Sequence, residues 1–119
     1  MPHLTLEYTS NLTRFDASGA LLHLNQILAA SGHFKSELDI KSRAIRLDTF
    51  RIGTSSEERA FVAVRLAVLS GRTEQVKREL SEMLLAALEG IDIGATKCHL
   101  QLSVEVLDMD TYSKSLHML

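Results

Sequence analysis

Apolar and polar residues alternate at both ends of the chain, which is the period expected of β-strands packed on one face. Near the start, Leu4, Leu6 and Tyr8 alternate with Thr5 and Glu7. The same alternation returns over residues 98–106 within a strand expected from Lys97 to Leu107. Two further strands are predicted, a basic one over about 40–50 and a run of β-branched and apolar residues over 60–69.

Two other stretches place apolar residues three and four positions apart, the spacing of an amphipathic helix. The first covers residues 17–28, with Asp16 as the expected N-cap and Gly32 as its stop. The second covers residues 76–87, with Thr73 as the expected N-cap, and Gly90 ends it. The chain therefore contains two helices between four strands.

The order of these elements is β-α-β followed by β-α-β, an apparent duplication with low residue identity between the halves. Right-handed crossovers give each half two parallel strands. We expect one α+β domain over residues 1–119, with pseudo-repeats at about 2–52 and 60–107 and a C-terminal appendage at 108–119. Its four-stranded mixed sheet carries both helices on one face.

The second face of this sheet includes Phe61, Ala63 and Leu69 besides polar groups such as Arg65 and Gln101. An apolar sheet face is rarely left to water, so we expect the chain to associate through it as a ring-shaped oligomer.

Composition narrows the function. The 119 residues are 45% hydrophobic and carry a net charge of −2, so nothing favours binding to nucleic acid or an anionic membrane. The single cysteine, Cys98, is expected to be a small buried strand residue, and the five histidines lack metal-ligand spacing. No signal peptide or membrane-spanning run is present in this sequence, and we expect a cytoplasmic protein without metal or cofactor.

Pro2 is the only proline in the chain. Removal of Met1 would leave it as an N-terminal secondary amine, which accepts protons once its pKa lies near neutrality. The following strand would hold this amine rigidly. Taken alone, a proline at position 2 is more often just an ordinary start of a chain.

Three cationic side chains are candidates for binding an anion. Arg72 stands one residue before the expected N-cap of the second helix, where free N–H groups and the helix dipole favour anions. Lys41 and Arg43 lie two apart on a strand and so share one face. Each also has a simpler interpretation, Arg72 as an exposed loop arginine and the pair as a solvated face or as partners of Glu7 or Glu105.

Further features are spread along the chain: Asn25 with 28–32 (Leu-Ala-Ala-Ser-Gly), 41–43 (Lys-Ser-Arg), 48–50 (Asp-Thr-Phe), 60–62 (Ala-Phe-Val) and 71–73 (Gly-Arg-Thr). Together with the opening Met-Pro-His, they resemble the 5-carboxymethyl-2-hydroxymuconate isomerases of the tautomerase superfamily. The resemblance extends to about Val106.

This resemblance implies a trimer that isomerises an unsaturated di- or tricarboxylate in the breakdown of homoprotocatechuate, an aromatic catabolic pathway, without a cofactor. It assigns Pro2 as general base and Arg72 to the substrate carboxylate or oxyanion. Phe50 is a further candidate for substrate binding, although an aromatic residue such as this is more often part of the core. A second family arginine aligns with Lys41, which keeps the charge and loses the bidentate fork. Either Arg43 compensates or the substrate is held differently.

Two alternatives remain open. One is another enzyme of the superfamily, a hydratase-like dehalogenase or a decarboxylase, in which a protonated Pro2 acts as acid beside Glu7. The other is a trimeric binding module that keeps the fold without activity, which retention of Met1 would favour.

Overall fold

The computed structural model describes residues 1–94 and 97–119 of the chain. Its elements are, in chain order, β1 (His3–Thr9), α1 (Ala17–Ala30), the 3-10 turn η1 (Glu37–Asp39), β2 (Lys41–Leu47), β3 (Arg59–Leu69), α2 (Glu74–Glu89) and β4 (His99–Met109). Part of the connection expected between α2 and β4, residues 95 and 96, lies outside the described residues.

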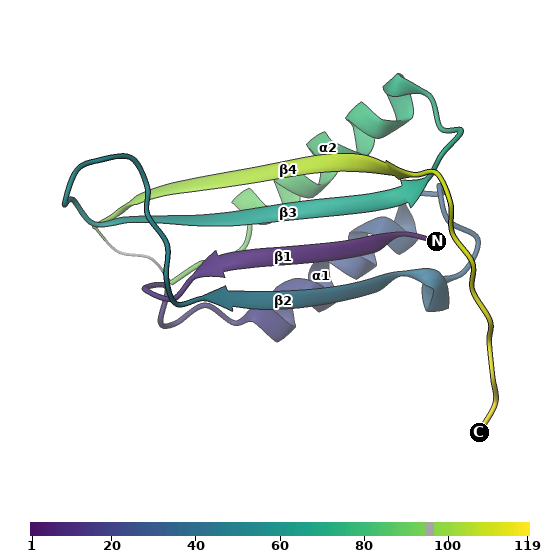
Figure 1. Cartoon of the computed structure of the whole chain (residues 1–119), viewed down its shortest axis with the longest axis horizontal. Coiled ribbons are helices and arrows are strands. Elements are labelled where there is room, and N and C mark those ends of the chain that lie inside the picture. Colours follow the sequence, from purple (N-terminus) through teal and green to yellow (C-terminus); the bar gives the residue numbers. More distant parts are fainter. Residues whose placement is uncertain (95–96) are drawn as a thin grey trace.

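The four strands form one mixed sheet in the order β2-β1-β3-β4, with both helices on one face (Figure 1). β1 runs parallel to β2, β3 runs parallel to β4, and the central pair β1 and β3 is antiparallel. Each parallel pair is joined through a helix, because a tight turn can join only antiparallel strands and parallel strands need a longer crossover connection. The expected α+β sheet with two helices on one face is confirmed.

Both helices begin at the predicted N-caps. The Asp16 carboxylate accepts a hydrogen bond from the Gly19 amide at 3.0 Å, and the Thr73 hydroxyl accepts one from the Val76 amide at 3.2 Å. Each cap satisfies an amide that the first helical turn leaves without a partner. The Thr73 cap fixes where α2 starts and so where Arg72 lies.

The core lies between the sheet and the helices. It is formed by alternate residues of the two central strands and by one stripe from each helix: Leu4, Leu6, Val62, Val64, Leu66 and Val68 from the sheet, and Leu24, Leu28, Leu80, Leu84 and Leu88 from the helices, all buried. Burying each such side chain stabilises the fold by roughly 1.5–3 kcal/mol before conformational entropy is subtracted.

Strand ends differ from the sequence expectation. β2 ends at Leu47 instead of reaching Phe50, because β1 itself ends at Thr9 and Ser10 donates its amide to the Leu47 carbonyl at 2.9 Å. β4 begins at His99, after Lys97 in a left-handed conformation (φ 57°), and pairs with β3 as far as Met109. Residues 108 and 109 therefore belong to the sheet. Cys98 is half-buried just before the strand instead of fully buried within it.

Neither of the two helices found in residues 1–94 and 97–119 covers the second face of the sheet (Figure 1). Phe61, Ala63 and Ala67 are half-buried on this face and Leu69 is 37% exposed. Arg65 and Glu105 form an ion pair there, with 2.6 Å between Nε and Oε1. We call this surface the open face. Among residues 1–94 and 97–119, no helix has the length and apolar character needed to cross a membrane.

Candidate active site

The N-terminal residues lie at the end of the sheet where β1 and β2 begin and β3 and β4 finish (Figure 1). The Pro2 side chain is fully buried, and its carbonyl accepts the Lys41 amide at 3.2 Å. This bond continues the β1–β2 ladder, so the backbone around Pro2 is held by the sheet. With Met1 attached, the Pro2 nitrogen is part of an amide and has neither a proton nor a free lone pair.

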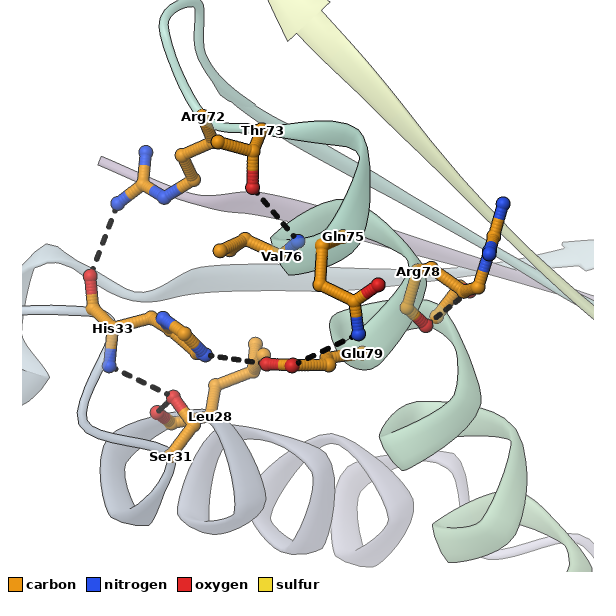
Figure 2. A network of polar contacts seen from close by, with 10 residues as sticks. Leu28, Ser31, His33, Arg72, Thr73, Gln75, Val76, Arg78 and Glu79 are labelled. Carbon is orange, nitrogen blue, oxygen red and sulfur yellow. Dashed lines mark hydrogen bonds and ion pairs between the residues drawn. The ribbon is translucent and has the colours of Figure 1, made fainter.

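Arg72 reaches this end of the sheet from the turn between β3 and α2. Its Nη2 donates to the His33 carbonyl at 3.0 Å (Figure 2), and its guanidinium lies over the Phe34 ring, 5.0 Å from the ring centroid. A weaker bond joins Nη1 to the Leu69 carbonyl at 3.5 Å. The side chain is half-buried, so it is held in place with part of its donor set free for an anion.

The loop that anchors Arg72 is itself fixed by polar contacts to both helices (Figure 2). The His33 amide donates to the Ser31 hydroxyl at 3.2 Å, and this hydroxyl donates to the Leu28 carbonyl at 2.6 Å. Across the gap to α2, His33 Nε2 lies 3.6 Å from a Glu79 carboxylate oxygen. The carbonyl that receives Arg72 is therefore positioned by the end of α1 and the first turns of α2.

Lys41 and Arg43 lie on β2 opposite His3 and Thr5 of β1, as the same-face spacing predicted. Lys41 is half-buried, and its Nζ donates to the Asp39 carbonyl at 3.2 Å. Arg43 is exposed, and its Nη2 lies 3.0 Å from His3 Nδ1. Neither cation is paired with Glu7 or Glu105, the carboxylates that the sequence offered as partners.

The charges at this end of the sheet act on the chain's amino group. The pKa of the Met1 amine is lowered from its ordinary value, chiefly by burial. Asp39 opposes this shift, whereas Arg72, Lys41 and Lys114 reinforce it. The pKa of the His3 imidazole is also lowered, first by burial and then by Arg43 and Lys41. The positive charges of Arg72 and Lys41 are therefore close enough to the N-terminus to affect its protonation.

The last ten residues, 110–119, which we call the C-terminal segment, also reach this site. The Tyr112 hydroxyl is 2.9 Å from His3 Nε2, and the two rings meet edge to face at 5.5 Å. Lys114 Nζ donates to a carboxylate oxygen of Asp39 at 2.7 Å and lies 3.2 Å from the Met1 sulfur. The hydrogen bond from Lys114 is the main cause of the lowered pKa of Asp39. Sequence reasoning missed Tyr112 and Lys114, which stand in no periodic pattern.

Two other candidates lie elsewhere in the same chain. Phe50 follows β2, at the opposite end of the sheet from Pro2, where its ring meets Phe61 edge to face at 6.5 Å. Glu7 lies further along β1 from His3, paired with Ala63 and Ile45. Within one chain the structure therefore brings Pro2, Arg72, Lys41 and Arg43 to one end of the sheet, without Phe50.

Within residues 1–94 and 97–119, no group of three or more His, Cys, Asp or Glu side chains is placed to hold a metal ion. The donor set at the candidate site is cationic, which suits an anionic ligand.

Comparison with solved structures defines the class of the fold. The structure named "Q0 fused 4-OT wild type symmetric trimer" matches this chain with a TM-score of 0.62 at 18% identity, over 90% of this chain and 85% of the other. At that identity the likeness concerns the fold. The four-stranded mixed sheet with two helices on one face is that of the tautomerase superfamily.

More similar proteins narrow the class. A crystal structure of a 5-carboxymethyl-2-hydroxymuconate isomerase from Deinococcus radiodurans R1 matches with a TM-score of 0.85 and 37% identity, over 97% of this chain and 90% of that one. The 5-carboxymethyl-2-hydroxymuconate Delta-isomerase of Escherichia coli is 29% identical over 90 residues, 75% of this chain and 71% of the relative.

The sequence model of the 5-carboxymethyl-2-hydroxymuconate isomerase family matches residues 2–117, and the chain belongs to this family. It is an isomerase of the tautomerase superfamily, so the resemblance seen in the sequence is confirmed. The match runs past Val106 and includes most of the C-terminal segment.

Proposed function

We propose that this protein is a cofactor-independent isomerase that shifts a proton within a carboxylated dienol of the 5-carboxymethyl-2-hydroxymuconate type, in the breakdown of homoprotocatechuate. The observation that carries the proposal is that Arg72 and Lys41 lie at the same end of the sheet as the N-terminus. Both cations lower the pKa of the chain's amino group. Family membership and the names of the Deinococcus and Escherichia coli relatives support the substrate class.

Pro2 serves as the base once Met1 has been removed. The ring nitrogen is then a secondary amine next to the position of the Met1 amine, whose pKa is lowered by Arg72, Lys41 and Lys114. Burial and nearby cations disfavour the protonated form of an amine, so its pKa falls below the free-chain value of about 7.7–8.0. A larger fraction of the amine is neutral near pH 7 and able to accept a proton.

Arg72 and Lys41 bind the carboxylates of the substrate. Arg72 presents a planar fork suited to a carboxylate, and Lys41 a point charge on the neighbouring strand. Of the two β2 cations, Lys41 is favoured because it acts on the N-terminal amine, whereas the Arg43 guanidinium is occupied with His3.

The reaction conserves atoms and electrons. The Pro2 amine takes the proton of the enol hydroxyl, and the oxygen lone pair forms a C=O bond. The double bonds shift by one position, and the carbon at the far end of the diene takes the proton back from the ammonium. Arg72 and Lys41 stabilise the enolate charge that develops between these two transfers.

We also propose a homotrimer. The open face exposes apolar area from the centre of the sheet that association would cover. One similar structure is described as a symmetric trimer. In such an assembly Phe50, far from Pro2 in its own chain, contacts substrate only at a neighbouring copy's site.

The test pairs intact-mass analysis with kinetics on one preparation. Chains that start at Pro2 should convert 5-carboxymethyl-2-hydroxymuconate, followed by ultraviolet absorbance, and chains that retain Met1 should not. Full activity in a preparation shown to retain Met1 throughout would remove Pro2 from the mechanism.

A further inference from the structure

The contact between Arg43 and His3 fixes which nitrogen of the imidazole carries its proton. A guanidinium has only donors, so Arg43 Nη2 at 3.0 Å from His3 Nδ1 must donate, and Nδ1 must be the acceptor. Neutral imidazole then carries its hydrogen on Nε2. The lowered pKa of His3 agrees with this neutral form, because its first causes are burial and the Arg43 charge.

The direction of the next hydrogen bond follows. His3 Nε2 lies 2.9 Å from the Tyr112 oxygen, and with its hydrogen on Nε2 the imidazole donates to the phenol. The Tyr112 hydroxyl therefore accepts in this contact, and its own hydrogen stays available for a further acceptor. A hydroxyl that accepts one hydrogen bond becomes a stronger donor in the next, because each bond in such a chain polarises its neighbour.

The hydroxyl lies next to the candidate site. His3 follows Pro2 directly, and Lys114, two residues after Tyr112, reaches both Met1 and Asp39. The edge-to-face packing of the two rings, at 70° between their planes, restricts the orientation of the phenol. Within the described residues, the contact with His3 is the one hydrogen bond of the Tyr112 hydroxyl, so the hydroxyl donates to no other group there.

We propose that Tyr112 donates a hydrogen bond to an oxygen of the bound substrate, and that Arg43 and His3 are positioning residues that orient its hydroxyl. This inference rests on the proposed isomerase function and adds a substrate contact from the C-terminal segment. It also gives Arg43 a role other than direct clamping of a carboxylate.

The first experiment compares two matched removals of a phenol hydroxyl, in chains that start at Pro2 and with 5-carboxymethyl-2-hydroxymuconate as substrate. Tyr112→Phe keeps the ring against His3 and should lower kcat/KM by about fivefold or more, the scale of a lost hydrogen bond. Tyr8→Phe is the control, because Tyr8 lies on the helix side of β1 against Phe15, 4.9 Å between ring centroids. A loss under fivefold in a folded Tyr112→Phe chain overturns the inference.

The second experiment asks whether Arg43 acts through Tyr112. Arg43→Met removes the donor that fixes the His3 tautomer and should lower activity, whereas Arg43→Lys keeps a donor and should restore most of it. In the Tyr112→Phe background, Arg43→Met should cost nothing further, because the hydroxyl it orients is gone. Independent, additive losses would show that Arg43 binds substrate directly and would overturn its positioning role.

The wild-type assay separates this inference from the proposed function. An inactive wild-type chain starting at Pro2 would overturn both, since the Tyr112 role needs the reaction. An active wild type with an unaffected Tyr112→Phe variant would overturn the Tyr112 role alone.

Discussion

Replacing Arg72 by methionine should damage catalysis far more than folding. The substitution keeps the length of the apolar stem and removes the guanidinium. The folded chain loses the hydrogen bond to the His33 carbonyl and the contact with the Phe34 ring. These are worth about 1 kcal/mol and about 0.5–1 kcal/mol, so the free energy of unfolding should fall by roughly 1.5–2 kcal/mol.

The catalytic loss should be larger. Removing one preorganised donor from an oxyanion site costs about 2.7–4 kcal/mol in the transition state, or roughly 100- to 1,000-fold in kcat. Domains of this size are stable by about 5–15 kcal/mol, so the variant stays folded at 25 °C and the kinetic loss is not a loss of native protein. The kcat of Arg72→Lys should lie between those of the wild type and Arg72→Met, because lysine keeps the positive charge and lacks the planar guanidinium fork.

Urea unfolding and the ultraviolet assay on the same samples measure the two effects. Arg78→Met is the matched control: Arg78 lies in α2 close to Arg72 in sequence, is exposed, and within the described residues its guanidinium has no hydrogen-bond or ion-pair partner. Turnover of Arg72→Met at the wild-type rate would refute the proposed anion site. A kinetic loss matched by the control would refute the role of this particular arginine.

Three further outcomes are expected. In chains starting at Pro2, kcat/KM should rise with pH through one ionisation below the free-chain value, because the cations that lower the Met1 amine pKa act near the ring nitrogen; a pH-rate profile with no such step contradicts this. Lys41→Ala should lose more activity than Arg43→Ala in parallel steady-state assays, and the reverse order would make Arg43 the clamp. Light scattering at micromolar concentration should give the mass of a trimer, and Phe61→Glu on the open face should dissociate it. A monomeric wild type would refute the proposed trimer.

Much of the fold follows from local signals in the sequence. The Asp16 and Thr73 caps need only a side-chain oxygen three residues before an amide, and both are found where the pattern places them. Strict alternation in β1 and β4 decides which side chains face the helices. The handedness of parallel crossovers then leaves few ways to arrange the sheet.

Part of the candidate site was predictable for the same reason. Arg72 is placed by the start of α2, and the parallel register of β1 and β2 brings Lys41 beside the first residues of the chain. The Tyr112 contact was not predictable, because its partner His3 is 109 residues away and neither position carries a periodic signal. Phe50 was grouped with the site without reference to which end of the sheet it occupies.

The central position of β1 has a consequence for synthesis of the chain. β1 is made before its antiparallel partner β3, which begins only at Arg59. At about 5–20 residues per second, that strand leaves the ribosome on the order of 3–12 s later. During this interval Leu4 and Leu6, both fully buried in the finished protein, have no sheet to enter on that side. The nascent chain therefore exposes the apolar side chains of β1 before β3 exists, and a chaperone that recognises such segments would meet β1 before the sheet is complete.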